Sequence, residues 1–143
     1  ARGMLGPSCH LFVMDAGRLG FADGAFDLVV CIQNGISAFK VKPLELMREA
    51  VRVTTPGGTA IFSSYSEHFW DDRLEWFELQ AAEGLLGEID RGQTRDGVIV
   101  CKDGFRATTF SPGDFLDLAR RMACVASIEE VDGSSVFCEI RVD

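Results

Sequence analysis

The chain has 143 residues, of which 47% are hydrophobic and 10% aromatic, and 22 acidic residues outweigh 14 basic ones for a net charge of −8. This length and apolar content predict a single folded domain with a buried core. The acidic balance argues against a nucleic-acid partner, because binding phosphates needs a basic face. The apolar runs are too short to cross a membrane, so no membrane partner is expected.

The cysteines indicate the compartment. Five are present, an odd number without a C-x-x-C pair, and only two histidines, His10 and His68, could help them bind a metal. This pattern predicts buried thiols in a reducing, cytoplasmic environment, with neither a metal site nor disulfides.

Three short apolar runs predict strands. After a turn at Gly6-Pro7, Leu11–Met14, Leu28–Ile32 and Thr59–Ser64 lack polar alternation. Such runs are typical of strands that are covered on both faces in a parallel sheet.

A helix is predicted between the second and third runs. Pro43 suits its first turn, and Leu44, Met47 and Val51 share one face. The Pro-Gly-Gly sequence at 56–58 is expected to turn the chain into the next strand. Strand, helix and strand form a βαβ unit, which implies parallel strands and a right-handed crossover.

Residues 64–110 interrupt the alternation of predicted strands and helices, and they are expected to form an insertion above the sheet. An aromatic stripe at helical spacing, which includes Trp70, Leu74 and Phe77, predicts an amphipathic helix. Two strand-like runs on either side of Asp103-Gly104 predict a hairpin with a two-residue turn.

The C-terminal part returns to the first pattern. Ser111 and Pro112 open a helix, and two strand-like segments, "VASIEEV" and "VFCEIRV", follow around the turn "DGSS". That link is too short for a parallel crossover, so the pair is expected to be antiparallel. The predicted fold class is α/β, with parallel strands, a C-terminal antiparallel pair and a helix-plus-hairpin insertion.

Polar residues follow two of the predicted strands. Asp15 and Ala16 follow the first, and Gln33 and Asn34 follow the second. Ligands of open α/β sheets bind beyond the carboxyl ends of the strands. A carboxylate there could accept from an exocyclic amine, and a backbone N–H could meet a ring nitrogen, which suits adenine. The alternative is that Asp15 only closes a turn.

The stretch "VMDAGRLGFADGAFDLVVCIQNGISAF" resembles class I S-adenosylmethionine-dependent methyltransferases between their third and fourth strands. Asp15-Ala16, Leu19, Phe21, Asp23 and Phe26-Asp27 occupy a pattern that is common there, with Gly20 where proline is usual. "CIQNGISAF" is similar to segments of the glycine N-methyltransferase-like branch, and "TPGGTAIF" agrees with the turn into the fifth strand.

The resemblance implies S-adenosyl-L-methionine as cofactor and a small-molecule methyl acceptor. Asp15 would accept from the adenine amino group, and Ala16 would offer its N–H to the ring. Ile32 and Gln33 would face the methionine part through backbone groups, and Asn34 would point toward the acceptor.

By the same resemblance, the insertion would form a substrate lid lined by Tyr65, His68 and Arg106, with Trp70 as a further candidate. Other interpretations remain open for these residues. Trp70 suits the core of the insertion, Arg106 a solvated hairpin position, and His68 either a general base or a merely satisfied side chain.

The chain departs from that family in lacking a glycine-rich acidic turn before Leu11. The resemblance therefore implies a truncated domain, the C-terminal part, which is inactive alone. The first predicted strand would then lack its neighbours, so strand edges are expected to pair between copies in a homodimer. A nicotinamide-binding Rossmann domain is disfavoured for the same reason, because it also requires a glycine-rich turn. A non-catalytic interaction or regulatory module on a degenerate scaffold remains the alternative.

Overall fold

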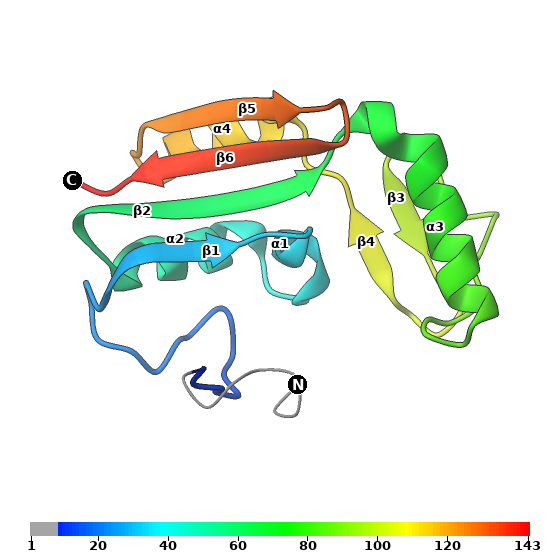
Figure 1. Ribbon diagram of the computed structural model, residues 1–143, viewed down its shortest axis with the longest axis horizontal. Helices are drawn as coiled ribbons and strands as arrows, with labels where there is room; N and C mark the ends of the chain where they lie inside the picture. The colour runs from blue at the N-terminus through cyan, green and yellow to red at the C-terminus, as the bar shows by residue number, and fades with distance from the viewer. Residues whose placement is uncertain (1–8) are drawn as a thin grey trace.

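The computed structural model describes residues 9–143, so the predicted turn at Gly6-Pro7 lies outside the described residues. A four-stranded sheet forms the body of the molecule (Figure 1). Its spatial order is β1 (Phe26–Cys31), β2 (Thr54–Tyr65), β6 (Ser135–Arg141) and β5 (Ala126–Val131).

The strand directions confirm the predicted α/β class. β1 and β2 are parallel, and α1 (Gly35–Ala38) and α2 (Pro43–Val53) connect them. β6 is antiparallel to β5, as the short link between these two strands predicted, and it also pairs antiparallel with β2.

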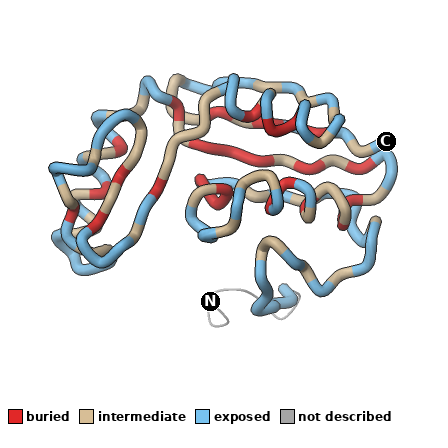
Figure 2. The backbone as a smooth tube through the Cα atoms, turned by 180° about the vertical axis from the view of Figure 1, so that it is seen from behind, coloured by how far each residue is buried: buried red, intermediate tan, exposed pale blue. Residues whose placement is uncertain are grey.

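One face of the sheet is covered by α2 and α4 (Pro112–Arg121), which Figure 2 shows in front of the strands. Ser111 starts α4 with a capping box, because its hydroxyl accepts from Asp114 N while the Asp114 carboxylate accepts from Ser111 N. The buried core between helices and sheet includes Met47, Phe62 and Phe115, none of which is exposed at all.

The opposite face has no helix on it among residues 9–143. Alternate residues of β1 therefore expose apolar side chains, with exposed fractions of 38% for Phe26, 56% for Leu28 and 53% for Val30, and Ile32 continues the stripe at 47%. β1 is also an edge strand of the sheet, so this apolar stripe lies beside an unpaired backbone edge.

A second unit lies beyond the ends of β1 and β2, at the right of Figure 1. This helix–hairpin unit comprises a short 3-10 turn η1 (Glu67–Phe69), α3 (Trp70–Ala82), β3 (Val98–Val100) and β4 (Arg106–Thr108). The predicted aromatic stripe of α3 packs against the hairpin in a small separate core of Phe77, Ile89, Ile99, Cys101 and Ala107.

Three predictions of local structure need correction. Leu11–Met14 forms no strand, because β1 does not pair with it. β2 begins at Thr54 and not at Thr59, since the chain extends directly from α2; a Cβ on Gly58 would lie 2.7 Å from the Asp27 carbonyl oxygen, so only glycine fits this approach.

The hairpin turn is also longer than predicted. Cys101 N donates to the Phe105 carbonyl, which leaves a three-residue loop that ends in Gly104 with φ +89°. A turn followed by a left-handed glycine is the usual form of such a loop.

Of the helices in the described part of the chain, none is long and apolar enough to span a bilayer.

Candidate functional site

Asp15 and Ala16 line a pocket of about 710 Å3 together with the aromatic ring of Phe39 and the side chain of Val41. Asp15 Oδ1 accepts from Gly17 N at 2.8 Å, so the turn-closing alternative is present in the structure. Its other oxygen, Oδ2, and the N–H of Ala16 have no partner among residues 9–143. One acceptor and one donor therefore remain free at the edge of an apolar pocket.

The loop that follows is fastened to α2 by Arg52. Its guanidinium donates to the carbonyl oxygens of Leu19 and Phe21, at 3.1 and 3.0 Å, and bonds to the carboxylates of Asp23 and Glu49. The hydrogen bond to Glu49, followed by that to Asp23, raises the pKa of Arg52 above its ordinary value. These contacts hold the chain that leads away from the pocket.

Gln33 and Asn34 form a strained turn at the end of β1. Both have left-handed backbones, with φ of 58° and 60°, which is uncommon outside glycine. Gln33 N donates to Ser63 Oγ at 3.0 Å, and Ile32 O accepts from Gly35 N at 3.2 Å. The backbone groups predicted to face the cofactor are thus partly used within the protein, while the side chains of Ile32 and Gln33 are exposed.

Asn34 is the centre of a buried polar network that joins β1, β2 and the helix–hairpin unit. Its Oδ1 accepts from Ser64 Oγ, and its Nδ2 donates to Ser37 Oγ, both at 3.0 Å. The two serine hydroxyls in turn accept from the backbone N–H groups of Phe110 and Thr108. Asn34 is 4% exposed, and its side-chain oxygen and nitrogen are both hydrogen-bonded within the protein.

The two polar pairs are connected indirectly, through the segment that follows α1. The ring of Phe39, which follows α1, packs against Gly35 beside Asn34. Val41 packs against Gly17 beside Ala16, and both Phe39 and Val41 line the pocket. Gln33 and Asn34 themselves do not line this pocket, and the first run is not a strand, so a rim shared by the two pairs stays a prediction.

The three lid candidates are scattered. Tyr65 is the last residue of β2 and is half-buried, with its ring stacked on Phe69 at 6.2 Å between centroids. His68 lies on the other side of the β2 end, where its Nδ1 bonds to Glu130 Oε1 of β5 at 2.7 Å. Arg106 is exposed on β4, and its side chain forms no ion pair among residues 9–143, as its solvated interpretation predicts.

The pairing with Glu130 raises the pKa of His68, because the carboxylate stabilises the imidazolium through the hydrogen bond and through charge. In return, the pKa of Glu130 is lowered, first by the hydroxyl of Ser66 and then by His68. Nε2 of His68 has no protein partner in the described chain, so the ring is oriented by one nitrogen and open at the other.

The burial of one charged residue, Arg73, was not predicted from the sequence. Arg73 lies on the apolar stripe of α3 and is completely buried. Burial lowers its pKa to about 10, because the charged form loses its hydration. The signal was its position, three residues after Trp70 on the stripe that packs against the hairpin.

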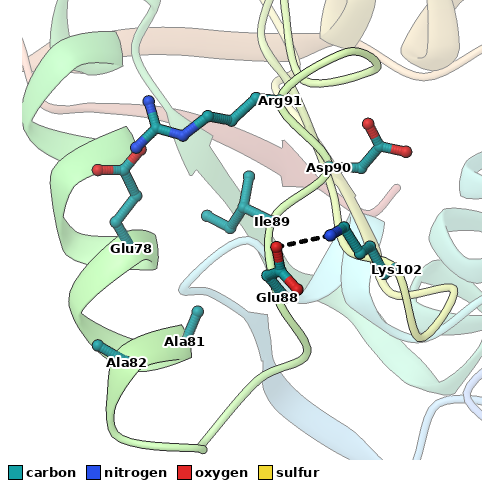
Figure 3. Close-up of a pocket in the computed structure, with 8 residues that line it drawn as sticks. All are labelled: Glu78, Ala81, Ala82, Glu88, Ile89, Asp90, Arg91 and Lys102. Atoms are coloured by element: carbon teal, nitrogen blue, oxygen red, sulfur yellow. Dashed lines mark hydrogen bonds and ion pairs between the residues drawn. The ribbon is translucent and has the colours of Figure 1, made fainter.

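A separate hollow of about 440 Å3 between α3 and the hairpin contains many charged side chains (Figure 3). Lys102 is paired with Glu88 at 2.6 Å and Arg91 with Glu78 at 2.7 Å. Both cations are thus paired with acids within the protein, although such exposed ion pairs contribute little to stability. Neither Lys102 nor Arg91 is therefore left without a partner to bind a ligand in this hollow.

Comparisons with known proteins agree with the order of elements. The sequence model of a methyltransferase domain family matches residues 2–62. A Pyrococcus horikoshii protein of known structure is 22% identical, with a TM-score of 0.63 over 92% of this chain and 61% of that one. A SAM-dependent methyltransferase from Methanosarcina mazei is 17% identical, with a TM-score of 0.61 over 92% of this chain and 66% of its own.

A third similar structure is the Burkholderia thailandensis 1,6-didemethyltoxoflavin-N1-methyltransferase with bound 1,6-didemethyltoxoflavin and S-adenosylhomocysteine. It is 9% identical, with a TM-score of 0.58 over 90% of this chain and 48% of that one. No curated protein matches the sequence. The chain thus spans about half to two thirds of the length of these three structures, and its fold is that of the class I S-adenosylmethionine-dependent methyltransferases.

Proposed function

We propose that this chain contributes to an S-adenosylmethionine-dependent methyltransferase that acts on a small molecule. The observation that carries the proposal is the pocket beside Asp15 and Ala16, where a carboxylate oxygen and an N–H have no partner among residues 9–143 and Phe39 and Val41 complete the lining. An adenine ring needs one acceptor for its amino group and one donor for a ring nitrogen. The bound S-adenosylhomocysteine of the Burkholderia enzyme supports the same class of cofactor.

The residues present fit such a cofactor on the adenine side. Asp15 Oδ2 would accept from the amino group, Ala16 N–H would meet the ring, and Phe39 and Val41 would enclose its faces. The cofactor supplies an electrophilic methyl group when it is bound. This chain's residues then contribute position and exclusion of water, which are the main sources of rate in such a displacement.

The network around Asn34 would set the distance between cofactor and acceptor. It fixes the left-handed turn at Gln33 and ties it to Thr108 and Phe110, which leave the helix–hairpin unit. In this proposal the insertion, residues 64–110, which contains the helix–hairpin unit, covers the acceptor, and Tyr65 contributes to the wall at the end of β2. The residues printed before Leu11 contain no glycine-rich acidic turn, so we expect residues 1–143 alone to bind the cofactor weakly and to be inactive.

Nucleoside titration followed by 1H–15N spectra tests the adenine assignment. Adenosine is expected to shift the Ala16, Phe39 and Val41 signals at millimolar concentration, and inosine much less, because its O6 meets the Asp15 carboxylate where adenosine offers an amino group. Asp15→Asn presents an amide to O6 and should remove or reverse that preference. Asp27→Asn, an exposed acid in β1 away from the pocket, serves as the matched control.

Equal shifts with both nucleosides, or shifts away from this pocket, would remove the observation on which the function depends. Calorimetry with S-adenosylhomocysteine tests the second part. A micromolar affinity of residues 1–143 would contradict the expected weakness of the chain alone.

The open edge of β1 supports a second candidate, an interaction module that forms a homodimer. The apolar stripe from Phe26 to Ile32 lies along an unpaired edge, and such an edge is self-complementary when two copies pair antiparallel. Sedimentation should show a dimer that Val30→Lys dissociates, while Val131→Lys at the β5 edge leaves it intact. A monomer at all concentrations would exclude this candidate.

A further inference from the structure

Arg73 fastens α3 to both ends of the hairpin. Its Nη1 donates to the carbonyl oxygen of Gly97 at 3.1 Å, just before β3, and to Thr109 Oγ1 at 2.5 Å, just after β4. These two bonds fix the plane of the guanidinium. They use only one of its three nitrogens.

The other two nitrogens, Nε and Nη2, are buried and have no hydrogen-bond partner among the described residues. Their N–H groups point the same way from one edge of the guanidinium, which is the edge that binds the two oxygens of a carboxylate side-on. No acidic side chain in residues 9–143 forms an ion pair with Arg73. The Nε–H and Nη2–H groups of Arg73 are therefore held in a fixed orientation without an acceptor among residues 9–143.

Aromatic rings surround this cation. The guanidinium carbon lies 4.8 Å from the ring centre of Tyr65, 5.5 Å from that of Phe77 and 6.0 Å from that of Trp70. Ring faces stabilise the positive charge, but they do not replace acceptors in the plane of Nε and Nη2. Leaving Nε–H and Nη2–H without acceptors therefore lowers the stability of the fold, and a cation that only stabilised the fold would not need to do so.

The position of the cluster connects it to the strand ends. Tyr65 is the last residue of β2, and its neighbour Ser64 donates to Asn34 Oδ1 at the end of β1. The half-buried side chain of Tyr65 therefore contacts the guanidinium from the same strand end that carries Ser64.

We propose that Arg73 binds a carboxylate of the methyl acceptor through Nε–H and Nη2–H, so that the substrates are carboxylate-bearing small molecules. This inference rests on the proposed function and specifies its substrate class. S-adenosylmethionine also carries a carboxylate, so the two sources must be separated by experiment.

The test uses the signal of the Arg73 side-chain Nε–H in 1H–15N spectra of residues 1–143. Benzoate is the probe, and benzamide, which has the same shape without the charge, is its control. Benzoate is expected to shift the signal in a saturable way, and benzamide is not. Arg73→Lys keeps the charge without the fork and should weaken benzoate binding at least tenfold, whereas Arg120→Lys, at an exposed arginine of α4, should leave it unchanged.

Equal shifts with benzamide, or no saturable shift with benzoate, would overturn the proposal. The same holds if S-adenosylhomocysteine moves the Arg73 signal and benzoate does not, because the carboxylate would then be the cofactor's. If benzoate binds while the nucleosides fail at Asp15, the anion site stands and the methyltransferase proposal falls. The wild-type titration decides the result even if Arg73→Lys does not fold.

Discussion

The body and the helix–hairpin unit are held together in different ways. The body places two helices on one face of the sheet over a large buried core, with no charged side chain in it. The helix–hairpin unit buries five apolar residues and adds a fully buried cation, Arg73, whose bonds reach both ends of the hairpin. Stabilisation by apolar burial is non-directional and tolerates small changes in geometry, whereas a buried hydrogen-bonded side chain depends on a few specific partners. The region expected to cover a substrate is thus the one with less apolar burial.

Removal of one large side chain from each core would test this difference. Phe62→Ala in the body is expected to cost about 3–5 kcal/mol and Ile99→Ala in the unit about 2–5 kcal/mol, since both side chains are fully buried. Urea unfolding combined with hydrogen exchange distinguishes the consequences. Phe62→Ala should lower protection throughout the chain, and Ile99→Ala should open mainly residues 67–109.

Leu85→Ala is the control, because that side chain is 72% exposed and its loss is expected to change stability by less than about 0.5 kcal/mol. Equal loss of protection in β6 and β4 after Ile99→Ala would mean that the two regions unfold together. The contrast between them would then be one of packing alone.

The same contrast explains which features the sequence could predict. α4 was predictable because its cap, Ser111 and Asp114, and its apolar face lie within ten residues. Antiparallel β5 and β6 followed from the length of their link. In the helix–hairpin unit, the helix and the hairpin were also locally encoded.

The features that sequence reasoning missed depend on distant partners. Leu11–Met14 has the composition of a strand, but a strand needs a neighbour, and β1 does not pair with it. The burial of Arg73 depends on Gly97 and Thr109, 24 and 36 residues away. The engagement of Asn34 depends on Ser64, 30 residues away, so its polarity alone could not reveal whether it is free.

The link between the two regions passes through Asn34, and its substitutions should have an intermediate effect. Asn34→Ala leaves Ser37 and Ser64 without their amide partner and keeps a non-glycine residue at φ 60°, so we expect a loss of about 1–3 kcal/mol. Asn34→Gly loses the same bonds but relaxes the backbone, and it should be about 1 kcal/mol more stable than Asn34→Ala. Urea unfolding measures both.

Asn34→Asp is the matched control, since it keeps an acceptor for Ser64 and loses only the donor to Ser37. It is expected to fall between wild type and Asn34→Gly. If Asn34→Ala and Asn34→Gly unfolded at the same urea concentration, the left-handed turn would carry no strain and the network would account for the whole effect.

The smallest effect is expected at His68, which joins η1 of the helix–hairpin unit to β5 of the body through Glu130. Because the pKa of His68 is raised in the folded state, the stabilisation by this pair is fully present below the ordinary histidine value of 6.5 and is lost as pH rises through the raised one. The pKa of Glu130 is lowered, so its contribution is present above the ordinary value of 4.5 and is lost as pH falls through the lowered one. The contact is therefore strongest between pH 4.5 and 6.5.

An NMR titration of the His68 ring should return its pKa toward 6.5 in Glu130→Gln and leave it raised in Glu129→Gln, a neighbouring acid that does not bond to the ring. Ser66→Ala should raise the pKa of Glu130, because its hydroxyl is the main cause of that shift. An unchanged His68 titration in Glu130→Gln would show that the ring is not held by β5. The helix–hairpin unit would then be attached to the body through β2, the Asn34 network, the bonds of Ser66 to Glu130 and Ser134, and the chain that enters α4.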